Sequence, residues 1–286
     1  MEYKELSNGF KIPVIGLGTW LMGGGREPDY SKDDKEIKAI KEAIKLGYTH
    51  LDTAEMYAVG HTEELIGKAI KKINKSKLFI TTKVTNEHLH YEDVINSAKA
   101  SMKRMKIKYI DLYLIHAPNP EIPIKETMNA MNYLIEQKLV RYIGVSNFTT
   151  KQMIEAQKVS KSKIVVNQIE YSLLTRNQGK YGSNNNMELE TVPYCQENNI
   201  IIMAERPIER GLLLKSHPIL DKLEQKYGKT KAQIAINWLI SKKNIVTIPK
   251  SSNVEHMKEN LGALGWKLSN KDVKLLDETN FESLKE

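Results

Sequence analysis

The sequence contains almost no cysteine, which limits how the fold can be stabilised. Cys195 is the single cysteine among 286 residues, so no disulfide can form within the chain. Structural disulfides are typical of oxidising compartments, and a chain of this length can bury a large core without them. We therefore expect a cytoplasmic protein in which Cys195 is a small, buried, apolar side chain.

Long apolar runs are also missing. The apolar runs are far shorter than the roughly 20 residues that cross a bilayer. The first residues, Met1-Glu2-Tyr3-Lys4-Glu5, lack the apolar stretch of a secretory signal peptide. We therefore expect neither a membrane span nor a signal peptide.

The familiar phosphate-binding loops are absent as well. The glycines of residues 16–20 (GLGTW) lack the third glycine and the following helix of a dinucleotide fingerprint. Gly23-Gly24-Gly25 is not followed by Gly-Lys-Ser/Thr, and Gly67-Lys68 lies inside a helical pattern. These segments therefore predict neither a Rossmann domain nor a P-loop.

The net charge of +8 raises the question of a nucleic-acid partner. The lysines, however, are spread along amphipathic segments such as residues 32–45 and 68–77, which is typical of solvated helix faces. We expect no nucleic-acid partner. A positive field would still attract an anionic cofactor.

Short apolar segments alternate with longer amphipathic segments along the whole chain. The pattern predicts strands at residues 14–17, 50–52, 78–83, 110–115, 142–146, 165–170, 200–204 and 246–249. It predicts helices at residues 32–46, 62–73, 91–105, 124–137, 150–158, 188–197, 219–241 (in two pieces) and 253–261. Eight regular units favour a single-domain (β/α)8 TIM barrel over residues 1–286, with a doubly wound open sheet as the alternative.

Three segments lie outside this repeat. Residues 3–6 and 10–13 flank Ser7-Asn8-Gly9, which predicts a β-hairpin that closes one end of the barrel. Residues 269–278 predict an extra C-terminal helix, and the polar residues 175–187 predict a mobile loop.

Four ionisable side chains are expected at the carboxyl ends of consecutive strands, where barrel active sites form. Asp52 ends the second strand, Tyr57 follows it, and Lys83 and His116 end the next two strands. A lysine ammonium beside a tyrosine lowers the pKa of the phenol, and an aspartate can hold that lysine in place. A histidine can orient a carbonyl group. Each residue alone has an ordinary structural explanation, but together they predict proton donation to a developing alkoxide.

These residues lie in segments that resemble the aldo-keto reductase family over essentially the whole chain. The matching segments are residues 47–57 (GYTHLDTAEMY), 78–83 (LFITTK), 111–116 (DLYLIH), 144–148 (GVSNF), 167–171 (NQIEY) and 248–251 (IPKS). The resemblance implies hydride transfer from NADPH to an aldehyde or ketone, with NADH as an alternative donor. It assigns the catalytic tetrad to Asp52, Tyr57, Lys83 and His116.

The same resemblance implies a set of cofactor-binding residues. Ser146, Asn147 and Gln168 match the residues that hold the nicotinamide carboxamide, although Ser146 and Asn147 could instead cap the next helix. Gly211 and Leu213 match the pyrophosphate segment. Lys250 and Ser251 match the residues that take the adenosine 2′-phosphate, and Asn260 matches the adenine contact; His256 lies in the same region as a further candidate. Ser252 with Glu255 predicts a capping box there.

The sequence departs from the family pattern at two positions. His256 stands where an arginine is usual, and it lacks the permanent charge and forked donors of arginine. Glu205 stands where an aromatic side chain usually stacks on the nicotinamide, so Arg206 or another side chain would have to fill that space. A carboxylate there would favour the oxidised, positively charged ring.

The substrate would be a small carbonyl compound, with Trp20, Met22, His88 and Tyr171 as candidate pocket residues beside Tyr57. We expect no metal, because His88 and His90 lack further ligands at metal-binding spacing. The alternatives are a cofactor-binding regulatory or redox-sensing protein with weak turnover, and a phosphate-handling barrel isomerase or lyase. No oligomer is evident, so a monomer is the default expectation.

Overall fold

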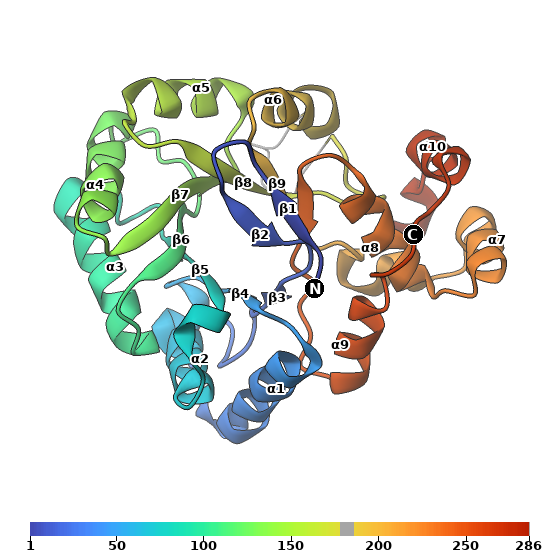
Figure 1. Ribbon diagram of the computed structural model, residues 1–286, viewed down its shortest axis with the longest axis horizontal. Helices are drawn as coiled ribbons and strands as arrows, with labels where there is room; N and C mark the ends of the chain where they lie inside the picture. Colours follow the sequence, from blue (N-terminus) through green and yellow to red (C-terminus); the bar gives the residue numbers. More distant parts are fainter. Residues whose placement is uncertain (178–185, 286) are drawn as a thin grey trace.

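The computed structural model describes residues 1–177 and 186–285. Within these residues, eight parallel strands form one curved sheet in the order β10-β9-β8-β7-β6-β5-β4-β3. Figure 1 shows the sheet as a ring with helices outside it. The strands of the ring are β3 (Leu17–Gly18), β4 (His50–Asp52), β5 (Phe79–Val84), β6 (Ile110–Ile115), β7 (Val140–Ser146), β8 (Ile164–Glu170), β9 (Ile201–Glu205) and β10 (Ile245–Thr247).

Backbone hydrogen bonds join the first strand segment to the last one. Gly16 N donates to Thr247 O at 2.9 Å, and Thr247 N donates to Val14 O at 2.9 Å. Gly18 N donates to Pro249 O at 3.2 Å. The sheet therefore closes on itself, which confirms the predicted barrel and shows that the open-sheet alternative is wrong.

Amphipathic helices cover the outside of the barrel (Figure 1). They are α1 (Asp33–Leu46), α2 (His61–Ile70), α3 (Tyr91–Met105), α4 (Ile124–Glu136), α5 (Thr150–Val159), α6 (Val192–Glu197), α7 (Pro218–Tyr227), α8 (Lys231–Ser241), α9 (Val254–Leu261) and α10 (Asn270–Glu278). Short turns supplement them: η1 (Tyr30–Lys32), η2 (Tyr57–Gly60), η3 (Lys75–Lys77), the π-helical η4 (Met187–Thr191), η5 (Glu209–Leu214) and η6 (Glu282–Lys285). The predicted C-terminal helix is confirmed as α10.

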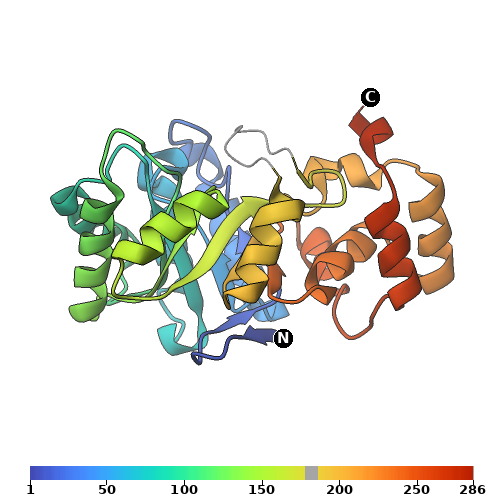
Figure 2. The same ribbon diagram turned by 90° about the horizontal axis from the view of Figure 1, so that it is seen from above.

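The N-terminal hairpin closes one end of the barrel, as predicted. It consists of β1 (Tyr3–Glu5) and β2 (Lys11–Pro13), and it lies across one end of the ring (Figures 1 and 2). The Phe10 ring packs edge-on against Tyr142 and Phe79, at centroid distances of 4.8 and 6.1 Å. Phe79 begins β5, so the hairpin covers the amino ends of the strands and leaves their carboxyl ends as the mouth.

Side chains from the strands fill the barrel interior. Leu112, Leu114, Val166 and Met203 belong to one buried cluster that also contains Phe10 of the hairpin. Because side chains alternate between the two faces of a strand, positions two residues further along point the same way. This alternation directs the last inward positions of several strands into the mouth.

Some predicted boundaries differ from the observed ones. The helix predicted at residues 62–73 spans His61–Ile70, so it begins one residue earlier and ends three residues earlier than predicted. The helix predicted at residues 188–197 begins with a π-helical turn. The capping box predicted for Ser252 and Glu255 is wrong, because Asn253 is the N-cap residue of α9 and accepts from Glu255 N at 2.9 Å.

Two further predictions concern single features of the chain. Cys195 is fully buried, as expected. Most of the loop predicted at residues 175–187 lies outside the described residues. Among the helices of residues 1–177 and 186–285, none is long and apolar enough to cross a membrane.

Close contact between α2 and α3 generates the first prediction. A Cβ added at Gly67 would lie 2.6 Å from the backbone oxygen of Arg104. Alanine normally stabilises a helix interior by about 1 kcal/mol over glycine, but overpacking costs about 1–3 kcal/mol. We expect Gly67→Ala to lower the free energy of unfolding in urea titrations. Lys68→Ala on the exposed side of α2 should change it by only about 0.5 kcal/mol or less, and a more stable Gly67→Ala protein would contradict the predicted contact.

Candidate active site

A buried ion pair lies at the centre of the barrel mouth. Lys83 Nζ at the end of β5 contacts Asp52 Oδ1 of β4 at 2.7 Å, and both side chains are almost completely buried. Lys83 Nζ also donates to the Thr53 carbonyl at 2.7 Å, and the second Asp52 oxygen accepts from Gln168 Nε2 at 2.8 Å. A buried charge is tolerated only when it is paired and hydrogen-bonded, and these contacts meet that requirement.

The phenol of Tyr57 lies beside this pair. Its hydroxyl oxygen is 3.4 Å from Lys83 Nζ, and Tyr57 as a whole is 7% exposed. The Trp20 ring packs edge-on against it at a centroid distance of 4.8 Å. The two residues that follow Tyr57, Ala58 and Val59, have φ of +48° and +53°. A β-branched residue in this region is strained, so the chain makes a costly turn directly after the phenol.

His116 completes the group on the β6 side. Its ring centroid is 5.8 Å from that of Tyr57. Burial, reinforced by the Lys83 charge, lowers the pKa of His116 to about 3, so the imidazole is neutral at ordinary pH. Its Nδ1 is buried and has no hydrogen-bond partner among the described residues. A neutral imidazole retains one N–H that can donate to a ligand.

The structure therefore brings the four predicted catalytic residues together. They come from the carboxyl ends of β4, β5 and β6, which are neighbours in the ring. The arrangement places a phenol hydroxyl and a neutral imidazole around one point, with a positive charge behind the phenol. Such a set can protonate an oxygen atom that is becoming negative.

Polar side chains continue around the mouth on β7 and β8. Ser146 ends β7, and Asn147 follows it with φ of +62°. Asn147 Nδ2 donates to the His116 carbonyl at 3.1 Å and to Ser146 Oγ at 3.0 Å. The helix-capping alternative for these two residues is wrong, because Thr149 caps α5. Ser146, Asn147 and Gln168 thus present hydroxyl and amide groups at the ends of adjacent strands.

A second group of predicted residues lies around the start of α9. Lys250 is exposed and pairs with Gly18 of β3 in a parallel bridge. Ser251 is buried, and its Oγ accepts from Asn253 N at 3.1 Å. His256 is exposed on α9, whereas Asn260 is 3% exposed. A cation beside a helix N-terminus is a chemically suitable place for a phosphate.

The end of β9 carries the sequence's most unusual site residues. The Arg206 side chain is held at the end of β8, because its Nη1 donates to Glu170 Oε1 at 2.7 Å. Glu170 is a buried residue that sequence reasoning missed, although its place at the end of a predicted strand was a usable signal. Gly211 has φ of +98° within η5, and the Leu213 side chain is buried in the main apolar cluster. Only the backbone of Leu213 is therefore available to a ligand.

The structure corrects two of the four predicted pocket residues. Met22 is fully buried in an apolar cluster, because the loop after β3 folds its side chain onto α1 and α2. Tyr171 is 1% exposed, stacks near Trp238, and donates its hydroxyl to Glu188 at 2.8 Å. Trp20 lies against Tyr57 at the mouth. His88 is half-exposed and pairs with Glu55 at 3.1 Å.

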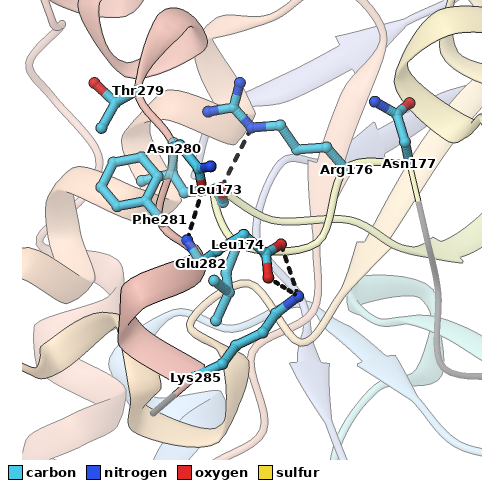
Figure 3. A pocket seen from close by; sticks show the side chains of 9 residues that line it. All are labelled: Leu173, Leu174, Arg176, Asn177, Thr279, Asn280, Phe281, Glu282 and Lys285. Atoms are coloured by element: carbon cyan, nitrogen blue, oxygen red, sulfur yellow. Dashed lines mark hydrogen bonds and ion pairs between the residues drawn. The ribbon is translucent and has the colours of Figure 1, made fainter.

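A cavity of about 320 Å³ lies away from the tetrad, between the loop after β8 and the C-terminal segment. Figure 3 shows its lining, in which Glu282 pairs with Lys285 and Arg176 Nε donates to the Leu173 carbonyl. Arg176 also donates to the carbonyls of Leu276 and Asp277 at the end of α10. The charged groups of this cavity are thus already occupied by structural contacts.

The fold is a (β/α)8 barrel, and the residues at its mouth form a proton-donating group of the kind that a carbonyl reductase needs. Comparisons with known proteins lead to the same class. The family model described as the Aldo/keto reductase family matches residues 14–280. The chain therefore belongs to the aldo-keto reductase family.

Individual relatives cover almost the whole chain. The Escherichia coli (strain K12) methylglyoxal reductase YeaE is 31% identical over 278 residues, covering 96% of this chain and 93% of the relative. The crystal structure of the thermostable aldo-keto reductase Tm1743 with the inhibitor epalrestat has a TM-score of 0.90 and 44% identity, covering 99% and 100% of the two chains. The Klebsiella pneumoniae aldo-keto reductase in complex with NADPH has a TM-score of 0.85 and 30% identity, covering 97% and 95%.

Two buried histidines generate a prediction about acid stability. Burial lowers the pKa of His50 to about 3, as it does for His116, whereas an unfolded chain protonates histidine near pH 6.5. Between pH 3 and pH 6.5 the unfolded state binds protons that the folded state does not bind, so lowering the pH destabilises the fold. We expect His50→Asn to reduce the slope of unfolding free energy against pH, between pH 4 and 6, by about 1.4 kcal/mol per pH unit.

The comparison is made between slopes, because His50→Asn will also lower stability at neutral pH by disturbing its bond to Thr81. His256→Asn is the matched control, since His256 is exposed on α9. Equal slopes for the wild type and His50→Asn, measured by urea titration at several pH values, would show that His50 does titrate in the folded protein.

Proposed function

We propose that this protein reduces an aldehyde or ketone to an alcohol with NADPH, using Tyr57 as the proton donor. The observation that carries the proposal is the contact of the Tyr57 hydroxyl with Lys83, whose charge is held by Asp52 in a buried ion pair. The ammonium stabilises the phenolate that remains after proton donation. His116 donates a hydrogen bond to the same carbonyl oxygen and fixes its orientation.

The residues present fit a nicotinamide dinucleotide. Ser146, Asn147 and Gln168 offer hydroxyl and amide groups suited to a carboxamide, and Lys250 with the N-terminus of α9 suits a phosphate. When bound, the dinucleotide supplies the hydride that adds to the carbonyl carbon. The carbonyl oxygen gains its proton from Tyr57, so the product is the neutral alcohol.

The relatives support the same reaction class. The Klebsiella pneumoniae protein was crystallised with NADPH, and the Escherichia coli relative is named as a methylglyoxal reductase. We propose a small carbonyl compound as the substrate, without a narrower assignment. We also propose a reducing, cytoplasmic location, supported by the single, buried thiol of Cys195.

Removal of the Tyr57 hydroxyl tests the assignment of the proton donor. We expect Tyr57→Phe to lower kcat for aldehyde reduction by about 100- to 10,000-fold, the range typical of a lost general acid. The loss of NADPH absorbance with a panel of aldehydes measures this rate. Tyr3→Phe in the hairpin, where the ring is 45% exposed, is the control and should retain full activity. An unchanged rate in Tyr57→Phe would exclude Tyr57 as the acid.

Removal of the Lys250 charge tests the phosphate site. We expect Lys250→Met to weaken NADPH binding by about 10- to 100-fold, as for a lost hydrogen bond to a charged group, and to leave NADH binding nearly unchanged. Fluorescence titration measures both dissociation constants. Lys258→Met in α9, the helix that follows Lys250, is the matched control, because Lys258 is exposed and pairs with Glu255 at 2.8 Å. Equal losses for the two cofactors would argue against a contact between Lys250 and the 2′-phosphate.

A further inference from the structure

We propose that Glu205 sets the relative affinity of the site for the oxidised and reduced forms of its cofactor, so that this preference changes with pH. The inference rests on the proposed function, because it requires a nicotinamide dinucleotide to bind in the barrel mouth. It adds to that function a specificity-determining carboxyl group at the end of β9.

The direction of Glu205 follows from the strand that carries it. Met203, two residues earlier on β9, belongs to the interior cluster, and its sulfur accepts from Gln168 Nε2 at 2.9 Å. Side chains two positions apart on a strand share a face, so Glu205 points into the mouth as well. Gln168 in turn donates to Asp52, which ties this side of the ring to the Lys83–Asp52 pair.

Among the described residues, the Glu205 carboxyl differs from the neighbouring acids in having no hydrogen-bond or ion-pair partner. Glu170 is held by Arg206 at 2.7 Å, and Glu209 Oε1 accepts from Ser172 Oγ at 2.9 Å. Over residues 1–177 and 186–285, no hydrogen bond or ion pair is formed by the Glu205 carboxyl. A partly buried carboxyl group that faces the mouth without a partner remains available to a ligand.

The charged groups around Glu205 determine when it ionises. Burial raises the pKa of Glu205. The charges of Arg206 and Lys83 lower this pKa, whereas those of Glu170 and Asp52 raise it further. Glu209 adds a further acid on the same loop, and His116 on β6 is neutral because its pKa is lowered to about 3. With the cations already paired, the carboxyl group changes charge nearer to neutral pH than an exposed glutamate does.

The two cofactor forms respond differently to that charge. The reduced nicotinamide ring is neutral, and the ring becomes positively charged when the hydride leaves. An ionised Glu205 therefore attracts the positive ring of NADP⁺ but not the neutral ring of NADPH, whereas a protonated Glu205 does not distinguish the rings. The second ionisation of the 2′-phosphate is common to both forms, so it cancels in the ratio of the two affinities.

The test is the ratio of dissociation constants for NADPH and NADP⁺, measured by fluorescence titration between pH 5.5 and pH 9. In the wild type we expect the ratio to rise by about tenfold across this range, because NADP⁺ binds more tightly as the carboxyl group ionises. Glu205→Gln should give a ratio that does not change with pH. Glu209→Gln keeps an acceptor for Ser172 and should retain the wild-type response, which separates Glu205 from its neighbours.

The outcomes distinguish this inference from the proposed function. A flat ratio in the wild type would overturn the role of Glu205 even if the variant failed to fold, since that measurement needs no substitution. A pH response that persists in Glu205→Gln would also overturn it. If neither dinucleotide bound the wild type at all, the proposed function itself would fail.

Discussion

The site depends on one constraint, which is that a lysine ammonium is buried inside a barrel. Moving an ammonium group from water into the protein interior costs on the order of several kcal/mol of free energy, unless protein groups replace its hydrogen bonds to water. Asp52 and the Thr53 carbonyl replace it here, each at 2.7 Å from Lys83 Nζ. The remaining direction of the ammonium faces the Tyr57 oxygen, so the contacts that make the charge tolerable also aim it at the phenol. The contacts that compensate the buried charge are therefore the same contacts that form the proposed catalytic arrangement.

The residues of the candidate site are distributed over several strands of the barrel. Asp52, Lys83 and His116 end three neighbouring strands, and Gln168 reaches Asp52 from across the mouth. Each group is held by backbone hydrogen bonds of its own strand, so no single loop has to define the geometry. The loops contribute what the strands cannot, which is the turn after Tyr57 and the ring of Trp20 against it.

Periodicity in the sequence predicted the barrel and the residues at the strand ends, and the Ser7-Asn8-Gly9 turn predicted the hairpin. This succeeded because buried strands and amphipathic helices carry local patterns that depend on few neighbours. The positions of Met22 and Tyr171 could not be predicted in this way. Whether a loop side chain faces a pocket or the core depends on contacts between distant segments, such as the packing of Tyr171 near Trp238. The pairing of Arg206 with Glu170 is equally non-local, since it joins the ends of two strands.

The hairpin has a consequence for the order of events in a catalytic cycle. Phe10 and its neighbours close the barrel at the amino ends of the strands, so only the carboxyl ends are open. A dinucleotide and a carbonyl compound must then share one entrance. Whichever ligand binds deeper in the mouth has to bind first and dissociate last, so the two ligands bind and leave in a fixed order.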